Sequence, residues 1–173
     1  VDYFSTRVSQ IITHSNKERV IYNDRVRLLK GYEGIYPNIG EKVICTENNW
    51  EIASSTGILS LTNGLQGIVT DIWQNDLEYE HGIFDMNIHN VILKNEEFNN
   101  LKCDGNIFLG HDWNPIEEAQ RRLLFNVDIF NQFDFGYAIT AYKAQGSEWN
   151  SVLAMGARMP FDEIKRYYYV VMT

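Results

Sequence analysis

The chain has 173 residues, of which 45% are apolar and 22% charged, and this composition is that of a globular protein rather than a disordered or fibrous one. The length suits one domain, or one domain that carries a smaller insert. The net charge of −8 argues against a protein that coats nucleic acid by charge alone. No apolar run approaches the ~20 residues of a membrane span, and the first residues lack a secretion signal. We therefore expect a cytoplasmic protein with no membrane partner.

Cysteine usage and local charge refine this description. Cys45 and Cys103 are far apart, neither belongs to a C-x-x-C pair, and the four histidines are scattered, so we expect buried, reduced thiols and no metal site. Five basic residues against two acids gather in 17–30, whereas 71–118 holds eleven acids against two lysines. The overall charge therefore hides a basic element near the start of the chain.

The first predicted elements are a strand and a helix. Val8–Thr13 is rich in β-branched residues and predicts a strand. Ser15 and Glu18 have the spacing of a capping box, which predicts a helix from there to Leu29 or Lys30, with Gly31 as its stop. A strand followed by a turn and a helix is a building block of α/β domains.

The following stretch, 39–109, predicts a small all-β domain. It contains short β-like runs separated by turn residues, and Asn63-Gly64 suits a type I′ hairpin. Such spacing is typical of a small barrel or sandwich. The predicted strands are Lys42–Thr46, Ile58–Leu61, Gln66–Trp73, Phe84–Leu93 and Ile107–Leu109.

Helices alternate with strands again after this stretch. Pro115–Leu124 predicts a helix that begins with proline and acids. The remaining predictions are a strand at Phe133–Thr140, a helical turn at Ala141–Gln145, a strand at Asn150–Met155, a helix at Phe161–Arg166 and a strand at Tyr167–Met172. The order therefore predicts one α/β domain (1–38 and 110–173) that carries an inserted β domain (39–109). Because the last predicted strand ends without a turn or cap, we expect the chain to be a fragment of a longer protein.

The strongest chemical signal is Gly136–Trp149, GYAITAYKAQGSEW. It predicts a buried strand that ends in a cluster of polar residues, and ligands of open α/β sheets bind at the carboxyl ends of strands. Thr and Lys bind phosphates, Tyr stacks on bases and Glu accepts from ribose hydroxyls. A polar corner without a ligand is the alternative, and the residues alone leave both open. The polar cluster consists of Thr140, Tyr142, Lys143, Gln145 and Glu148.

This stretch resembles motif V of superfamily 1 DNA helicases, in the form found in the RecD/Dda-like branch. The usual pattern is a strand followed by Thr-x-His-Lys-x-Gln-Gly, and Tyr142 stands here in place of the histidine. Three further stretches are similar to the same family. They are Ile11–Arg27 (with Ser15, Asn16, Lys17, Asn23 and Arg27), the G-x-x-V and N-G-x-x-G patterns at Gly40–Val43 and Asn63–Gly67, and Tyr169–Thr173, which resembles the start of motif VI.

The resemblance implies the second RecA-like domain of a helicase, with an inserted SH3-like β-barrel and with the P-loop itself absent. It implies that Thr140, Tyr142, Lys143 and Lys17 contact single-stranded DNA. It further implies that ATP hydrolysis is coupled to that contact by Gln145, Gly146, Glu148, Asn16 and Arg27.

The missing parts are as informative as those present. No G-x-x-x-x-G-K-[ST] P-loop occurs, and the motif VI arginine would follow Thr173. The resemblance therefore implies a parent helicase, 5′ to 3′ in direction, that uses ATP and Mg²⁺ in DNA repair or recombination. A first RecA-like domain of the same chain would complete the ATP site. We expect the isolated fragment to bind neither cofactor and to be inactive as an ATPase.

Two other functions compete with the helicase. The β domain could be a binding module for a protein partner or a single strand, although we expect its aromatic residues to be core (Trp73, Tyr79, Phe84, Phe98, Phe108 and Trp113). A hydrolase that uses Glu96-Glu97 or Glu117-Glu118 is disfavoured because neighbouring acids point in different directions.

Overall fold

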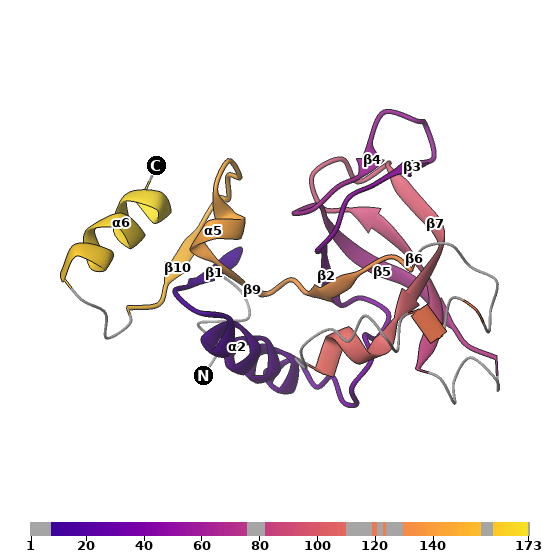
Figure 1. The fold of residues 1–173 in the computed structure, drawn as a ribbon, viewed down its shortest axis with the longest axis horizontal. Coiled ribbons are helices and arrows are strands. Elements are labelled where there is room, and N and C mark those ends of the chain that lie inside the picture. The colour runs from indigo at the N-terminus through magenta and orange to yellow at the C-terminus, as the bar shows by residue number, and fades with distance from the viewer. Residues whose placement is uncertain are drawn as a thin grey trace. The chain divides into compact units, whose positions relative to one another are not determined.

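The computed structural model describes residues 8–75, 82–109, 119, 120, 123, 130–156 and 161–172. The chain divides into two compact units (Figure 1): residues 1–33 with 136–173, here called the α/β unit, and residues 34–135, here called the β unit. The predicted domain boundaries at 38/39 and 109/110 stay predictions, as does the identity of each domain. No helix in the described part of the chain is long and apolar enough to span a membrane.

A three-stranded parallel sheet forms the centre of the α/β unit. Its strands are β1 (Gln10–Thr13), β9 (Ala138–Thr140) and β10 (Val152–Ala154), in the order β10-β1-β9. Each lies within a predicted strand. Because side chains alternate along a strand, Ile11 and Ile12 face opposite sides of the sheet. Ile11 packs with Val26 on one side.

The helix α2 (Asn16–Leu29) packs on the Ile11 side and begins and ends as predicted. The Ser15 hydroxyl accepts a hydrogen bond from the Glu18 amide at 3.3 Å. The Glu18 carboxylate in turn accepts from the amide of His14, one residue before the cap. The helix ends ahead of Gly31, whose φ of 78° suits glycine.

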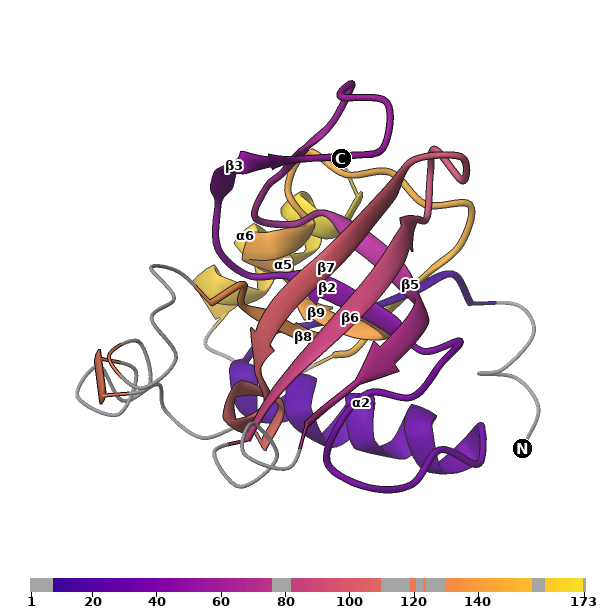
Figure 2. The ribbon, with the colours of Figure 1, turned by 90° about the vertical axis from the view of Figure 1, so that its right-hand side faces the viewer.

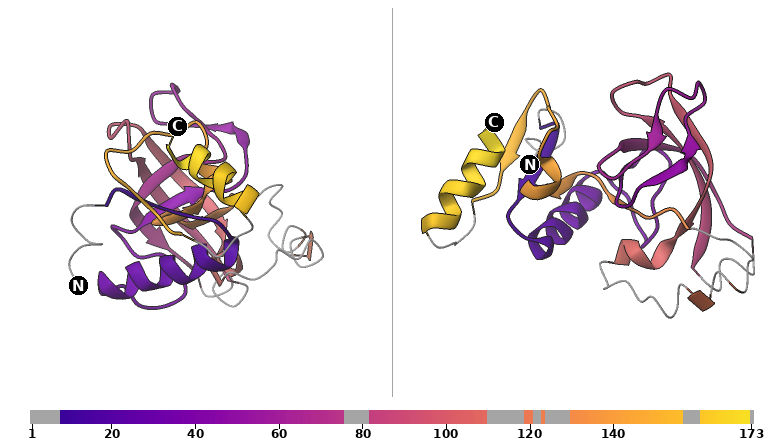
Figure 3. Two further views of the ribbon diagram at one scale, coloured as in Figure 1. Left: turned by 90° about the vertical axis from the view of Figure 1, so that its left-hand side faces the viewer. Right: turned by 45° about the horizontal axis from the view of Figure 1, so that its top comes forward.

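Two further helices of the α/β unit are described, one within the Gly136–Trp149 stretch and one after it (Figure 3). The short α5 (Ala141–Ala144) confirms the predicted helical turn. The predicted helix at Phe161–Arg166 is part of the longer α6 (Phe161–Met172), so the predicted strand at Tyr167–Met172 is wrong. The aromatic and β-branched run suggested a strand, but burial follows a helical period. Tyr167 is buried, Val170 and Val171 are half-buried, and the tyrosines between them are exposed.

The β unit is built on an antiparallel sheet in the order β7-β6-β5-β2-β8 (Figure 2). A separate two-stranded ribbon, β3 with β4, lies between β2 and β5 in sequence. The bounds are β2 (Lys42–Cys45), β3 (Asn49–Ala53), β4 (Ser60–Leu61), β5 (Gln66–Trp73), β6 (Ile83–Asn90), β7 (Glu97–Asp104) and β8 (Phe133–Phe135), with a 3₁₀ helix η1 (Gly105–Leu109).

The sheet of the β unit is not a closed barrel in the part of the chain that the structure describes, because its edge strands β7 and β8 do not pair with each other. One isolated parallel bridge joins Cys103 of β7 to Asn131, two residues before β8. The Asn131 amide donates to the carbonyl of Lys102 at 2.8 Å. The two edges of the sheet therefore approach each other at a single point.

Several predicted elements of the β unit need correction. Ile107–Leu109 belongs to η1 and is not a strand, and only Ser60–Leu61 of Ile58–Leu61 is a strand. The strands β3 and β7 were not predicted. The predicted helix at Pro115–Leu124 lies outside the described residues, apart from positions 119, 120 and 123.

The Asn63-Gly64 turn differs from the predicted type I′ hairpin. Gly64 has a φ of 92°, whereas among the described non-glycine residues only Asn100 has a positive φ. The Leu65 amide donates to the Thr62 carbonyl at 3.0 Å, which closes a type II turn. The flanking strands β4 and β5 do not pair with each other. A glycine is needed here, but the turn connects two sheets rather than two strands of one hairpin.

The predicted strand at Phe133–Thr140 is two strands that belong to different units. β8 pairs with β2, whereas β9 pairs with β1. The break falls at Gly136 and Tyr137, whose carbonyls accept hydrogen bonds of 3.2 and 3.1 Å from the buried amide of Gln10. A continuous apolar run in the sequence therefore conceals the boundary between the units.

Large aromatic and aliphatic side chains fill the core of the β unit. Phe84 is fully buried, and its ring lies 5.7 Å from that of Tyr36 and 5.8 Å from that of Phe108. Phe98 is also buried, whereas Trp73 is 41% exposed. Cys45 and Cys103 are buried, as predicted, and neither forms a disulfide with another described residue. The predicted aromatic residues Tyr79 and Trp113 lie outside the described residues.

Candidate functional site

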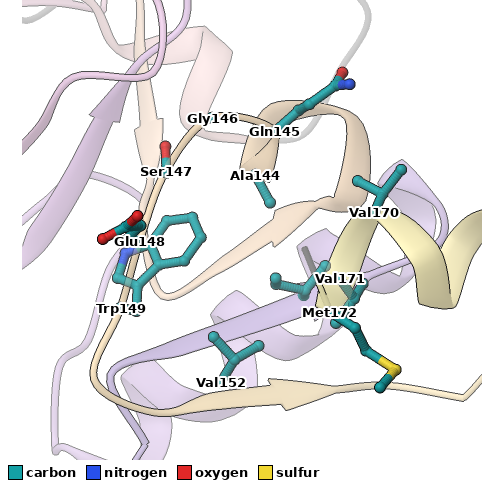
Figure 4. A pocket seen from close by; sticks show the side chains of 11 residues that line it. Ala144, Gln145, Gly146, Ser147, Glu148, Trp149, Val152, Val170, Val171 and Met172 are labelled. Carbon is teal, nitrogen blue, oxygen red and sulfur yellow. The ribbon is translucent and has the colours of Figure 1, made fainter.

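A cleft of about 510 Å³ lies in the α/β unit, on the side of the sheet opposite α2 (Figure 4). Ile12 of β1 and Val152 of β10 form its floor, because alternation turns both side chains away from the Ile11 face. The segment after α5 forms one wall and the end of α6 another. The complete lining is Ile12, Ala144, Gln145, Gly146, Ser147, Glu148, Trp149, Val152, Val170, Val171 and Met172.

A tight turn shapes the wall that follows α5. Gln145 has φ −60° and ψ 125°, and Gly146 has φ 82°, which are the angles of a type II turn. The Ser147 amide closes the turn by donating to the Ala144 carbonyl at 3.1 Å. A Cβ at Gly146 would meet no atom within 4 Å, so conformation rather than space demands glycine. The turn leaves the side chains of Gln145 and Glu148 exposed.

The chemistry of the lining separates into an apolar floor and a polar rim. Gln145, Ser147 and Glu148 supply amide, hydroxyl and carboxylate groups, and the lining contains no lysine or arginine. These groups suit the hydroxyls of a sugar or the edge of a base, which are neutral hydrogen-bonding partners. They do not suit a triphosphate, which requires cations or a cradle of backbone amides. The described residues hold no cluster of three or more potential metal ligands.

The predicted DNA-contacting residues of motif V lie at the end of β9 and on α5. Thr140 is the N-cap residue of α5, and its side chain makes no capping hydrogen bond. Tyr142 is 86% exposed, and Lys143 is half-buried. None of the three lines the cleft. The motif V stretch therefore divides into a surface part, 140–143, and a cleft part, 145–148.

The predicted residues of α2 do not join them. Asn16 and Lys17 are exposed in the first turn, where the Asn16 side chain accepts from Arg19 at 3.3 Å. Arg27 is buried in the last turn. None of the three predicted positions lines the cleft.

One residue of the same helix, Asn23, has a clear structural role. It is 2% exposed, and its amide group donates to the Ala138 carbonyl at 3.1 Å and accepts from the Ala138 amide at 2.8 Å. The amide and carbonyl of Ala138 point away from β1, because β1 bonds instead to the carbonyl of Tyr137. The side chain of Asn23 thus takes the place of a further strand beside β9. A polar residue in the buried stripe with Val26 was the available sequence signal.

A second buried polar contact attaches α6 to the sheet. The Tyr167 hydroxyl lies 2.9 Å from the carbonyls of both Ile12 and Met155, and burial raises the pKa of this tyrosine to about 12. At the start of α6, Glu163 lies 3.7 Å from the imidazole of His14. These contacts fix α6 so that its last turn borders the cleft.

The remaining cleft residues were not predicted. Ser147 and Trp149 lie next to the residues that match motif V. A type II turn predicted at Gln145-Gly146 would have indicated that Ser147 and Trp149 line the cleft together with Gln145 and Glu148. The sequence predicts a strand for Val170–Met172, which the structure shows to be helical. Their approach to the cleft depends on the helical period of α6, which the sequence signal concealed.

The two acids of the alternative hydrolase site, Glu96 and Glu97, differ in burial. Glu96 is buried and accepts from the Thr56 hydroxyl at 2.7 and 2.8 Å, whereas Glu97 is exposed on β7. The hydroxyls of Ser54 and Thr56 lower the pKa of Glu96. A carboxylate held in this way stabilises a loop and does not form a matched pair with its neighbour. The other pair, Glu117-Glu118, lies outside the described residues.

Comparison with known proteins gives a relationship of fold. No protein-family model matches the sequence, and no curated protein is similar to it. Among solved structures, the chain is similar to the crystal structure of Pif1 helicase from Candida albicans, with a TM-score of 0.55 and 15% identity. The match covers 96% of this chain and 42% of that chain. This chain is therefore a mixed α/β protein that folds like part of a known helicase structure.

Proposed function

We propose that this chain is part of a superfamily 1 DNA helicase, in which ATP hydrolysis drives movement along single-stranded DNA. The observation that carries the proposal is the shared cleft. Gln145–Glu148 match motif V, Val170–Met172 belong to the stretch that resembles motif VI, and both line it. Two segments that resemble parts of one ATPase, and that are separated in sequence, therefore meet at one site. The similarity of fold to a helicase structure supports the same function.

The division of motif V suggests a division of roles. We assign DNA contact to Thr140, Tyr142 and Lys143, because an exposed aromatic ring beside a lysine suits stacking on a base next to a phosphate. We assign coupling to Gln145, Gly146 and Glu148, with Glu148 toward the ribose. Lys17 as a DNA contact, and Asn16 and Arg27 as coupling residues, rest on the resemblance alone.

The nucleotide requires more than this chain supplies. ATP with Mg²⁺ is the proposed substrate, and its hydrolysis supplies the free energy for movement. The rim of the cleft offers partners for a sugar or base but no cation for the phosphates. We propose that a P-loop on a first RecA-like domain and an arginine after Thr173 complete the site in a longer protein. The 173 residues alone should then show no ATP turnover stimulated by DNA, and measurable turnover would contradict this.

The β unit and the direction of movement complete the proposal. We propose that the β unit is an SH3-like domain inserted in a second RecA-like domain. The near approach of its sheet edges at Cys103 and Asn131 supports this. Movement from 5′ to 3′ follows only from the resemblance to the RecD/Dda-like branch.

Binding of labelled oligo-thymidine at low salt tests the DNA assignment. We expect Tyr142→Ala to weaken binding by about tenfold, since stacking of one base contributes about 1–3 kcal/mol. Lys143→Ala should also reduce the salt dependence of binding by about one unit of log–log slope. The control variants are Trp50→Ala and Lys94→Ala, which remove an exposed aromatic ring and an exposed lysine from the β unit. Unchanged binding by both motif V variants would refute the assignment.

A further inference from the structure

The ribbon of the β unit presents large apolar side chains to solvent. Trp50 of β3 is 69% exposed, and Ile58, in the turn before β4, is 71% exposed. Ile92 and Leu93, in the loop between β6 and β7, are 82% and 41% exposed. We call this set of four residues the ribbon surface. Single exposed apolar residues are common, but Ile58, Ile92 and Leu93 lie on two loops that hydrogen bonds join, and grouped apolar residues mark an interaction site.

Hydrogen bonds hold the two loops of the ribbon surface together. The Ser55 amide donates to the Glu97 carbonyl at 2.8 Å, and the Glu97 amide donates to the Ser55 hydroxyl at 3.2 Å. The Thr56 hydroxyl lies 2.7 and 2.8 Å from the two carboxylate oxygens of Glu96, which is buried. Loops tied by these bonds cannot easily fold their apolar side chains inward.

The ribbon contributes little to the core that its exposed residues border. Leu61 is its only apolar side chain among the buried residues of the described chain. The ribbon pairs with itself and not with the five-stranded sheet. Trp50 and Ile58 are therefore exposed on backbone that hydrogen bonds hold in place. A surface that is ordered before binding loses less conformational entropy when a partner binds.

Charge identifies the kind of partner. Three carboxylates are exposed here: Glu47 before β3, Glu51 on β3 and Glu97 on β7. One lysine, Lys94, is exposed in the loop between β6 and β7. The whole β unit contains sixteen acids and five bases. Such a surface repels the phosphates of nucleic acid and attracts lysine and arginine.

We propose that the ribbon surface is a docking site for a basic, apolar segment of a partner protein. Trp50 is the proposed anchor, because tryptophan is enriched among the residues that contribute most to binding at protein interfaces. The exposed carboxylates of Glu47, Glu51 and Glu97 would attract the basic side chains of the segment. This function is separate from the proposed DNA contact at Tyr142, which belongs to the other unit.

Titration of the isotope-labelled 173-residue chain with defined peptides tests the proposal by NMR. The probe is a short peptide of alternating leucine and lysine. The two comparison peptides carry glutamate in place of lysine, or serine in place of leucine. We expect saturable shifts centred on Trp50, Ile58 and Ile92 with the first peptide only, and weaker binding at high salt. Absence of saturable binding, or equal binding of the glutamate peptide, would overturn the proposal.

Matched variants connect the binding to the surface. Trp50→Ala should weaken binding of the leucine–lysine peptide by about tenfold or more, as at other interface anchors. Ile39→Ser removes a side chain that is 59% exposed elsewhere on the β unit and should change nothing. Equal unfolding temperatures would show that both variants fold. Three results would each refute the proposed partner. The first is an unchanged peptide affinity in Trp50→Ala. The others are stronger binding of oligo-thymidine than of peptide at the ribbon surface, and self-association of the chain that Trp50→Ala abolishes.

The two proposals fail in distinguishable ways. Loss of DNA binding in Tyr142→Ala with intact peptide binding, or the reverse in Trp50→Ala, separates the two surfaces. A result that refutes the peptide site therefore leaves the helicase assignment unaffected.

Discussion

The two units of the chain carry opposite charge. The α/β unit contains ten basic residues against seven acidic ones, and the β unit five against sixteen. The net charge of −8 is therefore the sum of a basic unit and a strongly acidic one. An average over the whole chain would exclude nucleic acid as a partner, whereas the division leaves the α/β unit free to approach phosphate.

The units also differ in what holds their strands. Among the described residues, sixteen buried apolar side chains lie in the β unit and seven in the α/β unit. In the α/β unit, polar side chains bond directly to strand backbone: Gln10 to Tyr137, Asn23 to Ala138, and Tyr167 to Ile12. The larger share of buried apolar side chains lies in the β unit, and side-chain hydrogen bonds to the backbone position the strands beside the candidate site.

Removing a core aromatic residue of the β unit should have the largest effect. Phe84→Ala should lower the free energy of unfolding by about 3–5 kcal/mol, because Phe84 is fully buried between Tyr36 and Phe108. Hydrogen exchange should show the loss mainly in amides of the β unit. Phe84→Leu, which keeps most of the volume, should cost less. Equal loss of protection in both units would contradict their different stabilisation.

Removing the Asn23 side chain tests the polar stabilisation of the α/β unit. Asn23→Ala leaves the buried amide and carbonyl of Ala138 without this partner, and each costs about 1–3 kcal/mol. DNA binding should weaken as well, because β9 leads to Thr140. Asn23→Asp keeps the acceptor but places a buried carboxylate oxygen against the Ala138 carbonyl, so it should lose at least as much stability as alanine. A stability unchanged in both variants would show that the contact is dispensable.

The Tyr167 hydroxyl should have a smaller, pH-dependent effect. Tyr167→Phe should cost about 1 kcal/mol through the lost hydrogen bonds to Ile12 and Met155. Burial raises the pKa of folded Tyr167 to about 12 from 10.0, so its contribution is complete below pH 10.0 and falls as the pH rises toward 12. Unfolding measured against pH should show this fall in the parent and less of it in the variant. Identical pH profiles would refute the role of the hydroxyl.

Acidification should have the smallest effect, and it concerns the contact of Glu96 with the loop that contains Ser54 and Thr56. The pKa of Glu96 is lowered by the Ser54 and Thr56 hydroxyls, so its stabilising contribution is present above the ordinary value of 4.5 and is lost as the pH falls through the lower folded value. NMR signals of Thr56 should therefore shift in acid. In Glu96→Gln, this acid-induced shift should disappear. Persistence of the shift in the variant would exclude Glu96 as its cause.

The sequence predicted elements whose own residues define them. Ser15, Glu18 and Gly31 located both ends of α2, and a β-like run bounded by turn residues located β5. The strand β7 was missed because its inward residues change phase. Phe98 is followed by Leu101 and Cys103, and the change coincides with the register shift and the positive φ of Asn100.

The candidate site was only partly predictable. Gln145, Gly146 and Glu148 were predicted as site residues from the local resemblance, whereas their approach to Val170–Met172 depends on tertiary contacts of α6. The tyrosine and valine run in α6 favours a strand by local propensity, but the contact of Tyr167 with Ile12 and Met155 fixes it as a helix. Tertiary structure overrides propensity at the place where the two motifs meet.

The pairing of β2 with β8 has a consequence for the kinetics of folding. Gln10 and Tyr137, which must meet when β1 and β9 pair, are 127 residues apart in sequence. Val43 and Phe135 are partners within the β unit, so its folding shortens the loop that β1 and β9 must close to roughly a quarter of its length. This lowers the entropic cost of closure by about 1 kcal/mol. Folding of the acidic β unit therefore favours the pairing of β1 with β9 in the basic α/β unit.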